Sequence, residues 1–265
     1  MEGRKYAADY TGKLMPKILL IGGSDGSCGA GVFADFETIK SLNSDANVVV
    51  TSVTSQNDHQ FEHSLAIPPA NIKSQLDVIA ADSCQAVKVG MLPNNESVEI
   101  VSKYFSINRF SRVILDPVLA SSSGVSLSSR ESVDALKQTL FPKVDLITPN
   151  LMEARLILGL KNSHKNDLVE IAKDCLSFGS RSVLLKGGHL EGDTCIDVFV
   201  EKDKPSKAVV FKHKRLLNGT SVRGTGCRLA SAIAHFYGSG NELGEAVSRG
   251  INFLQSYLKS KLEIR

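Results

Sequence analysis

Short apolar runs, most of them continuous, alternate with amphipathic stretches along most of the chain. Continuously apolar runs are typical of strands that helices cover on both faces. The predicted strands are residues 17–21, 47–53, 86–89, 112–115, 145–148 and 182–185. The predicted helices lie between them, at residues 31–42, 70–81, 96–105, 130–139, 152–158 and 167–178. This strand-then-helix order predicts an α/β fold with right-handed crossovers and a mainly parallel sheet.

The pattern changes beyond the last of these strands. Residues 194–200 and 208–216 are rich in β-forming side chains and flank a charged turn, which predicts a β-hairpin at one edge of the sheet. Helices are expected at 226–237 and 242–262. Because no linker composition interrupts the pattern, residues 17–265 are predicted to form a single domain. The polar residues 1–16 are predicted to be a disordered N-terminal extension.

Composition excludes several classes of protein. The net charge of +3 is too small for a protein that binds nucleic acid through charge, and 42% hydrophobic residues exclude disorder. No run approaches the roughly 20 apolar residues of a membrane span. Five cysteines without CxxC spacing indicate a cytoplasmic protein rather than a disulfide scaffold or a zinc site. Six histidines show no metal-ligand spacing, and most are expected at the surface.

Ligands of open parallel sheets bind beyond the carboxyl ends of the strands, so the residues that follow each apolar run are of most interest. Asp116, Asn150, Glu153 and Lys186 all occupy such positions. Carboxylates on separate strand ends can hold Mg²⁺ together with phosphate oxygens and water. A lysine beside two glycines can reach a phosphate. The alternatives are a turn cap for Asp116, a helix N-terminal charge for Glu153 and a solvated charge for Lys186.

Two glycine-rich segments are further candidate ligand sites. The first glycine-rich loop, GGSDGSCGAG at residues 22–31, allows backbone amides to approach a ligand, or else forms a tight surface turn. Its GAGVFA match to a dinucleotide-binding pattern begins too far beyond the strand to be convincing. The second is Gly224, Thr225, Gly226 and Cys227, directly before a predicted helix, and we call residues 224–227 the anion loop.

A helix that starts in this way exposes unpaired amides and a partial positive charge, which suits a phosphoryl group. The pKa of Cys227 is expected to fall in such a first turn. In the alternative interpretation, the glycines only cap the helix and Cys227 packs in the core.

Taken together, the motifs resemble those of the ribokinase-like superfamily, and more narrowly the hydroxymethylpyrimidine/phosphomethylpyrimidine kinases of thiamine biosynthesis. The resemblance is carried, in this order, by GGSDGSCGAG, SQN at 55–57, VKVGML at 87–92, LDPV at 115–118, ITPNLMEA at 147–154, LLKGGHLEGD at 184–193 and GTGC at 224–227. It implies a three-layer α/β/α sandwich, a homodimer, and the use of ATP and Mg²⁺.

The resemblance also implies roles for individual residues. The anion loop would stabilise the transferred phosphate, with Cys227 near the attacking hydroxyl and able to accept its proton. Asp116 and Glu153 would organise Mg²⁺ largely through water. The residues implied at the nucleotide phosphates are Lys186, Asn150, Gly224 and Gly226. Gln56 would pair with the pyrimidine edge, and the rest of the substrate pocket would comprise Gly23, Ala30, Asp35, Met91 and Val118.

The predicted function is phosphorylation of 4-amino-5-hydroxymethyl-2-methylpyrimidine and of its monophosphate. A pyridoxal kinase of the same fold is the first alternative, and a non-catalytic pyrimidine-binding relative is the second. The chain departs from the usual motifs at Cys28, Phe33, Ser122, Arg223 and Arg228. Arg223 or Arg228 either adds positive charge for phosphate or faces solvent.

Overall fold

The computed structural model describes residues 15–263, except 109, 121–126, 128, 161–166, 189–192 and 217–221. Within this part of the chain the strands form one nine-stranded sheet with the order β3-β2-β1-β4-β5-β6-β7-β8-β9. The strands are β1 (Lys17–Asp25), β2 (Asp45–Gln56), β3 (Phe61–Ala66), β4 (Ala86–Val89), β5 (Val113–Leu115), β6 (Leu146–Ile147), β7 (Ser182–Leu185), β8 (Thr194–Glu201) and β9 (Val209–Lys214).

The six central strands are parallel, and the two edges are antiparallel. Parallel pairing runs without interruption from β2 through β1, β4, β5 and β6 to β7. The β8–β9 hairpin forms one edge, as predicted. The opposite edge is a second hairpin, β2–β3, which the sequence pattern did not predict. Strand β3 escapes prediction because it has no buried residue, so the continuous apolar signal is missing.

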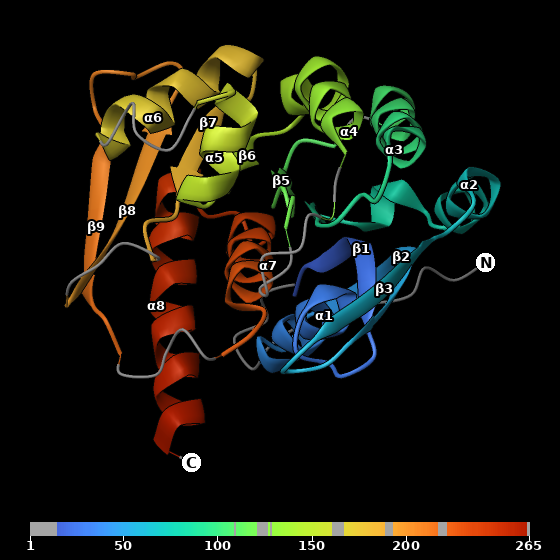
Figure 1. Cartoon of the computed structure of the whole chain (residues 1–265), viewed down its shortest axis with the longest axis horizontal. Helices are drawn as coiled ribbons and strands as arrows, with labels where there is room; N and C mark the ends of the chain where they lie inside the picture. Colours follow the sequence, from blue (N-terminus) through green and yellow to red (C-terminus); the bar gives the residue numbers. More distant parts are fainter. Residues whose placement is uncertain are drawn as a thin grey trace.

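Helices cover both faces of the sheet, which confirms the three-layer α/β/α sandwich (Figure 1). One face carries α2 (Pro69–Asp77), α3 (Asn95–Ile107), α4 (Arg130–Ala135), α5 (Leu151–Leu158) and α6 (Leu168–Cys175). The other face carries α1 (Gly31–Ser41), α7 (Thr225–Gly238) and α8 (Leu243–Glu263). The predicted helix at 130–139 changes at residue 136 into a π-helical turn, Leu136–Leu140.

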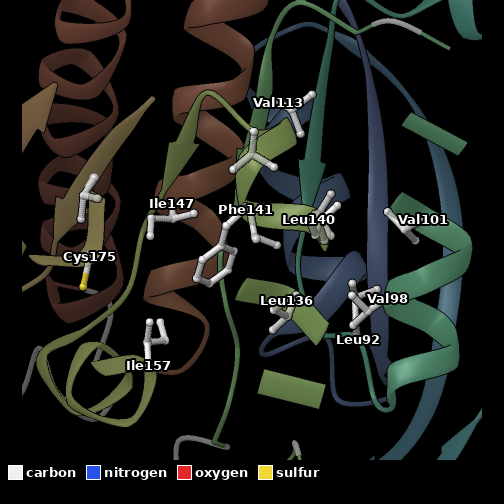
Figure 2. Close-up of a cluster of buried hydrophobic side chains, with 14 of the residues drawn as sticks. Leu92, Val98, Val101, Val113, Leu136, Leu140, Phe141, Ile147, Ile157 and Cys175 are labelled. Carbon is white, nitrogen blue, oxygen red and sulfur yellow. The ribbon is translucent and has the colours of Figure 1, made fainter. Parts of the chain in front are cut away.

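Successive side chains of each central strand enter opposite layers, which explains why the strands are mostly apolar at successive positions. Leu19 and Ile21 join the core beneath α2–α6, part of which is drawn in Figure 2. Ile18 and Leu20, between them, join the core beneath α1, α7 and α8. Because the strand backbones are rigidly buried from both sides, their carboxyl ends form a fixed platform for side chains.

Two residues expected to be exposed or disordered, Pro16 and His235, are buried. Pro16, the last residue of the predicted extension, is buried, while residues 1–14 lie outside the described part of the chain. His235 was expected at the surface with most histidines, but it is only 6% exposed and contacts the Ser44 hydroxyl through Nδ1 at 2.9 Å. Among the described residues, no helix has the length and apolar character needed to cross a membrane.

One charged pair lies inside the layered core. Lys88, in the middle of β4, places its Nζ 2.6 Å from Oδ2 of Asp35 on α1, and their side chains are 1% and 0% exposed. The hydroxyl of Ser231 on α7 donates to Oδ1 of the same carboxylate at 2.9 Å. Although burial alone would lower it, the Asp35 carboxylate raises the pKa of Lys88 above its usual range. The pair therefore joins β4, α1 and α7.

We expect Lys88→Met to lower the free energy of unfolding by about 3–5 kcal/mol, because Asp35 is left as an uncompensated buried charge. Urea denaturation measures this loss. Lys73→Met is the matched control, because Lys73 and Asp77 are both more than half exposed and their ion pair is worth at most about 1 kcal/mol. A similar small loss for Lys88→Met would contradict the structural role of the buried pair.

Candidate active site

A cleft of about 370 Å³ opens at the carboxyl ends of the parallel strands, between the first glycine-rich loop and the start of α7. Every residue that the sequence placed in the site borders this cleft: Gly23, Ala30, Asp35, Gln56, Met91, Asp116, Val118, Asn150, Glu153, Lys186, Gly224, Thr225, Gly226 and Cys227. A second cavity of about 210 Å³ lies on the side of β8, β9 and α8. The two cavities share Asn150, Lys186, Val222, Thr225 and Gly226, so they meet at the anion loop.

The anion loop is shaped by two glycine positions that touch. Gly224, the N-cap of α7, has a φ of 68°, which favours glycine. A Cβ at Gly224 would also collide with the carbonyl oxygen of Gly29, so the anion loop packs directly on the first glycine-rich loop. Within the described part of the chain no side chain caps α7, so these residues leave its first amides available to an anion.

Cys227 lies in the first turn of α7, as predicted, but its thiol is only 8% exposed. Burial raises the pKa of Cys227 to about 11; Lys88 opposes this rise, and the carboxylates of Asp35 and Asp116 add to it. The expectation of a lowered thiol pKa is therefore wrong. The helix N-terminus favours a thiolate, but removal from water at this position outweighs it. At neutral pH the group is a thiol.

Asp116 and Lys186 form an ion pair on the cleft floor. Lys186 Nζ donates to Asp116 Oδ1 at 2.8 Å, and the Thr148 hydroxyl donates to the same oxygen at 2.9 Å. Although burial opposes ionisation, Lys186 and Lys88 hold the pKa of Asp116 below its usual range. A Cβ at Gly226 would lie 3.0 Å from Lys186 Nζ and 3.4 Å from Asp116 Oδ2, so both charges face the anion loop.

Glu153 forms a capping box with Asn150 at the start of α5. Its Oε2 accepts from the backbone N–H of Asn150 at 2.8 Å, and the Asn150 side chain accepts from the N–H of Glu153 at 2.9 Å. Burial raises the pKa of Glu153 to about 7; Lys186 opposes this effect and Asp116 adds to it. Glu153 is therefore a charged residue at a helix N-terminus, as the alternative interpretation stated. It also borders the cleft.

These carboxylates fit a Mg²⁺ ion that is held mostly through water and phosphate. Within the described residues, no group of three or more His, Cys, Asp or Glu side chains is arranged to hold a metal by itself. Mg²⁺ usually keeps several waters and takes only one or two carboxylates when it binds phosphates. Asp116 is ionised, and its Oδ2 faces the anion loop, so the donor set matches that mode of binding.

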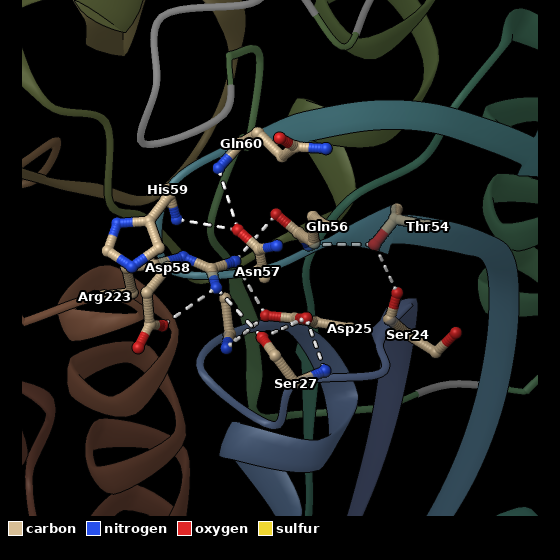
Figure 3. A network of polar contacts seen from close by, with 11 residues as sticks. Ser24, Asp25, Ser27, Thr54, Gln56, Asn57, Asp58, His59, Gln60 and Arg223 are labelled. Atoms are coloured by element: carbon tan, nitrogen blue, oxygen red, sulfur yellow. Dashed lines mark hydrogen bonds and ion pairs between the residues drawn. The ribbon is translucent and has the colours of Figure 1, made fainter.

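The end of the cleft beside β1 and β2 is polar and already hydrogen-bonded. Gln56, at the end of β2, donates from Nε2 to the Thr54 hydroxyl at 2.8 Å and accepts at Oε1 from Arg223 at 2.8 Å (Figure 3). Asp35 borders the cleft from below: it is fully buried, and both carboxylate oxygens are already bonded. It supports the floor of the pocket.

The arginines that flank the anion loop do not behave as expected from sequence. Arg228 is 4% exposed, so it does not face solvent. It pairs with Glu37 at 2.7 Å and stacks over the Tyr257 ring with a centroid distance of 4.4 Å, away from the residues that border the cleft. Arg223 also avoids solvent, with a side chain 9% exposed, and two carboxylates neutralise it.

Sequence reasoning assigned no role to Lys88, Thr148 or Asp25. Lys88 had a visible signal, because a charged residue inside a continuously apolar strand needs a buried partner. Asp25 and Thr148 had none, since aspartate and threonine are common at strand ends.

Comparison with known proteins decides the family. A model of the family described as phosphomethylpyrimidine kinase matches residues 25–265. The chain belongs to this family. A hydroxymethylpyrimidine/phosphomethylpyrimidine kinase of Aquifex aeolicus is 35% identical over 247 residues, which cover 93% of this chain and 95% of the relative. The thiamine biosynthesis bifunctional protein ThiED of Geobacter sulfurreducens is 34% identical over 91% of this chain, which spans only 49% of that relative.

Solved structures show the same fold. The pyridoxal kinase from Staphylococcus aureus in complex with pyridoxal has a TM-score of 0.83 and 25% identity, over 92% of this chain and 88% of that one. The same kinase has also been solved in complex with ADP and with AMP-PCP.

The protonated state of Cys227 can be tested by alkylation followed by mass spectrometry. We expect exposed Cys28 to react first at pH 8 and Cys227 to react slowly. Because only the thiolate reacts, the rate at Cys227 should rise about tenfold per pH unit and continue rising above pH 9. A rate at Cys227 that is already maximal at pH 7 would show that its thiol is ionised.

Proposed function

We propose that this protein is an ATP- and Mg²⁺-dependent kinase that phosphorylates the hydroxymethyl group of 4-amino-5-hydroxymethyl-2-methylpyrimidine. One observation carries the proposal: two cavities meet at an uncapped helix N-terminus, beside an ionised carboxylate and a lysine. In this assignment the pyrimidine occupies the larger cleft and ATP the smaller cavity. The γ-phosphate then lies at the anion loop, within reach of the acceptor hydroxyl.

Each polar group has a defined task in this arrangement. The amides of the anion loop hold the transferring phosphoryl group, whose charge grows on its outer oxygens. Lys186 neutralises phosphate charge while Asp116 keeps the ammonium group in place at 2.8 Å. The Cys227 thiol can donate a hydrogen bond but is not ionised to act as a base, so catalysis depends mainly on positioning.

Magnesium would be held by Asp116, with Glu153 acting through water. When bound, the ion offsets charge on the nucleotide phosphates and orients them. The raised pKa of Glu153 means that this carboxylate ionises only near pH 7. The protein's contribution to metal binding therefore weakens as the pH falls below that value.

We also propose the finer assignments that follow from the family. The pyrimidine monophosphate is a second substrate, converted to the pyrophosphate. The protein acts in the cytoplasm, which is supported by five free cysteines.

It forms a homodimer, which is supported by the opposed and exposed side chains of Val53 and Leu65 on the β2–β3 hairpin. Light scattering should give twice the mass of one chain.

Pyridoxal phosphorylation is the second candidate function. The observation in its favour is the structural likeness to a pyridoxal kinase, at a TM-score of 0.83. Both substrates carry a hydroxymethyl group on an aromatic ring, so the fold does not separate them. The relatives at 34–35% identity, named for pyrimidine phosphorylation or for thiamine biosynthesis, favour the pyrimidine.

An assay of ADP release with Mg²⁺–ATP distinguishes these candidate functions. We expect turnover with the hydroxymethylpyrimidine and with its monophosphate, and little with pyridoxal or without substrate. Turnover mainly with pyridoxal would select the second candidate. If no substrate raised ADP release while calorimetry still showed pyrimidine binding, the protein would be a binding relative rather than a kinase.

The anion loop can be tested without removing a charged group. Gly226→Ala places a methyl group 3.0 Å from Lys186 Nζ and 3.4 Å from Asp116 Oδ2, in the space assigned to phosphate. Because this methyl group would shift the phosphoryl group away from the amides of the anion loop, we expect kcat to fall about 10²-fold, as when one preorganised donor to a developing charge is lost. Gly244→Ala is the matched control, since its Cβ meets only Phe199 at an ordinary 3.7 Å. An equal fall in both variants would reject the assignment.

A further inference from the structure

Arg223 directly precedes the anion loop, yet its guanidinium extends across to the ends of β1 and β2 (Figure 3). Nη2 donates to Asp25 Oδ2 and to Gln56 Oε1, both at 2.8 Å. Nη1 donates to the Ser27 hydroxyl at 2.9 Å and to Asp58 Oδ1 at 3.3 Å. One side chain therefore joins three segments that are far apart in sequence.

The charges around Arg223 are balanced within the protein. The Asp25 side chain is fully buried, and it lies against an arginine whose side chain is 9% exposed. Its Oδ1 also accepts from the backbone and hydroxyl of Ser27, and its Oδ2 from the backbone N–H of Ala30. Asp58 is a second ion-pair partner, so the guanidinium is paired with two carboxylates of the protein itself. Arg223 is thus placed to organise the cleft rather than to attract phosphate.

The contact with Gln56 fixes the orientation of a side-chain amide. Its oxygen faces Arg223, and its nitrogen faces the Thr54 hydroxyl, which in turn donates to the Ser24 carbonyl oxygen at 2.8 Å. A rotated amide would place its NH₂ against the guanidinium, donor to donor. Held as it is, the amide retains one lone pair and one N–H for a ligand in the cleft.

We propose that Arg223 is a positioning residue that sets substrate selectivity by holding the Gln56 amide in this single orientation. The cleft then presents an acceptor and a donor side by side, which matches an aromatic ring with an amino group next to a ring nitrogen. Pyridoxal carries no amino group beside its ring nitrogen and pairs with only half of this arrangement. The inference rests on the proposed function, because it takes the aminopyrimidine as the occupant of the cleft.

The first test compares wild type with Arg223→Met, which keeps the length of the side chain but removes its donors. The readouts are kcat, KM for the aminopyrimidine, KM for pyridoxal and KM for ATP. We expect KM for the aminopyrimidine to rise about tenfold, the effect of weakening one good hydrogen bond. KM for ATP and KM for pyridoxal should stay near their wild-type values, so that selectivity falls.

A second set of variants separates positioning from stability. Arg223→Met alone leaves the buried Asp25 without its ion-pair partner, which lowers the melting temperature. Adding Asp25→Asn removes both members of the pair, so the melting temperature should recover toward wild type while KM for the aminopyrimidine stays high. Gln56→Ala should raise KM for the aminopyrimidine, and adding Arg223→Met to it should cause no further rise. Arg249→Met, at an exposed arginine on α8 that bonds Asn241, is the matched control and should leave every constant unchanged.

The outcomes distinguish this inference from the proposed function. A wild-type protein that neither binds the aminopyrimidine by calorimetry nor phosphorylates it would overturn both. Wild-type turnover with unchanged selectivity in Arg223→Met would overturn the role of Arg223 alone. Additive effects of Gln56→Ala and Arg223→Met would also overturn it, because a residue that acts through Gln56 has no effect once the amide is removed.

Discussion

The site depends on the fully buried ion pair between Lys88 and Asp35. Lys88 emerges from β4 into the layer beneath α1 and α7, where a cation without a partner would be strongly disfavoured. Asp35 supplies the partner, and Ser231 on α7 binds the other carboxylate oxygen. Since α1 begins at the end of the first glycine-rich loop and α7 begins within the anion loop, the pair fixes the relative position of both loops. Cys227, one turn before Ser231, lies in the field of these charges and remains a neutral thiol.

Charge is arranged in two balanced groups around the cleft. Asp116 with Lys186 forms the group under the anion loop, and Arg223 with Asp25 forms the group beside the ends of β1 and β2. In each group, neighbouring hydroxyls or amides bond the carboxylate as well, so neither ion is left uncompensated in a low-dielectric environment. Ligands therefore meet side chains whose orientations are already set, which reduces the ordering cost of binding.

Much of this arrangement was predictable from sequence. Strands β4 and β7 match their predicted bounds at both ends, because each is a short, fully buried and mostly apolar run. The predicted site residues all reach one cleft because the carboxyl ends of parallel strands share an edge. The predictions that were wrong concern properties set by burial and by contacts with residues distant in sequence. The helix N-terminus at Cys227 was visible in the sequence, but the desolvation that dominates its pKa was not. Arg228 is buried because Tyr257, on α8, covers it.

The contact between Gly224 and the Gly29 carbonyl limits how these loops can change during evolution. A side chain at Gly224 meets both an unfavourable backbone conformation and the backbone of the other loop. No substitution at position 29 relieves this, since the obstacle is a main-chain oxygen that every residue carries. A chain that lengthened or redirected one loop would have to move the other in the same step. Diversity in substrate choice is therefore more accessible through side chains around the loops, such as Arg223, than through the loops themselves.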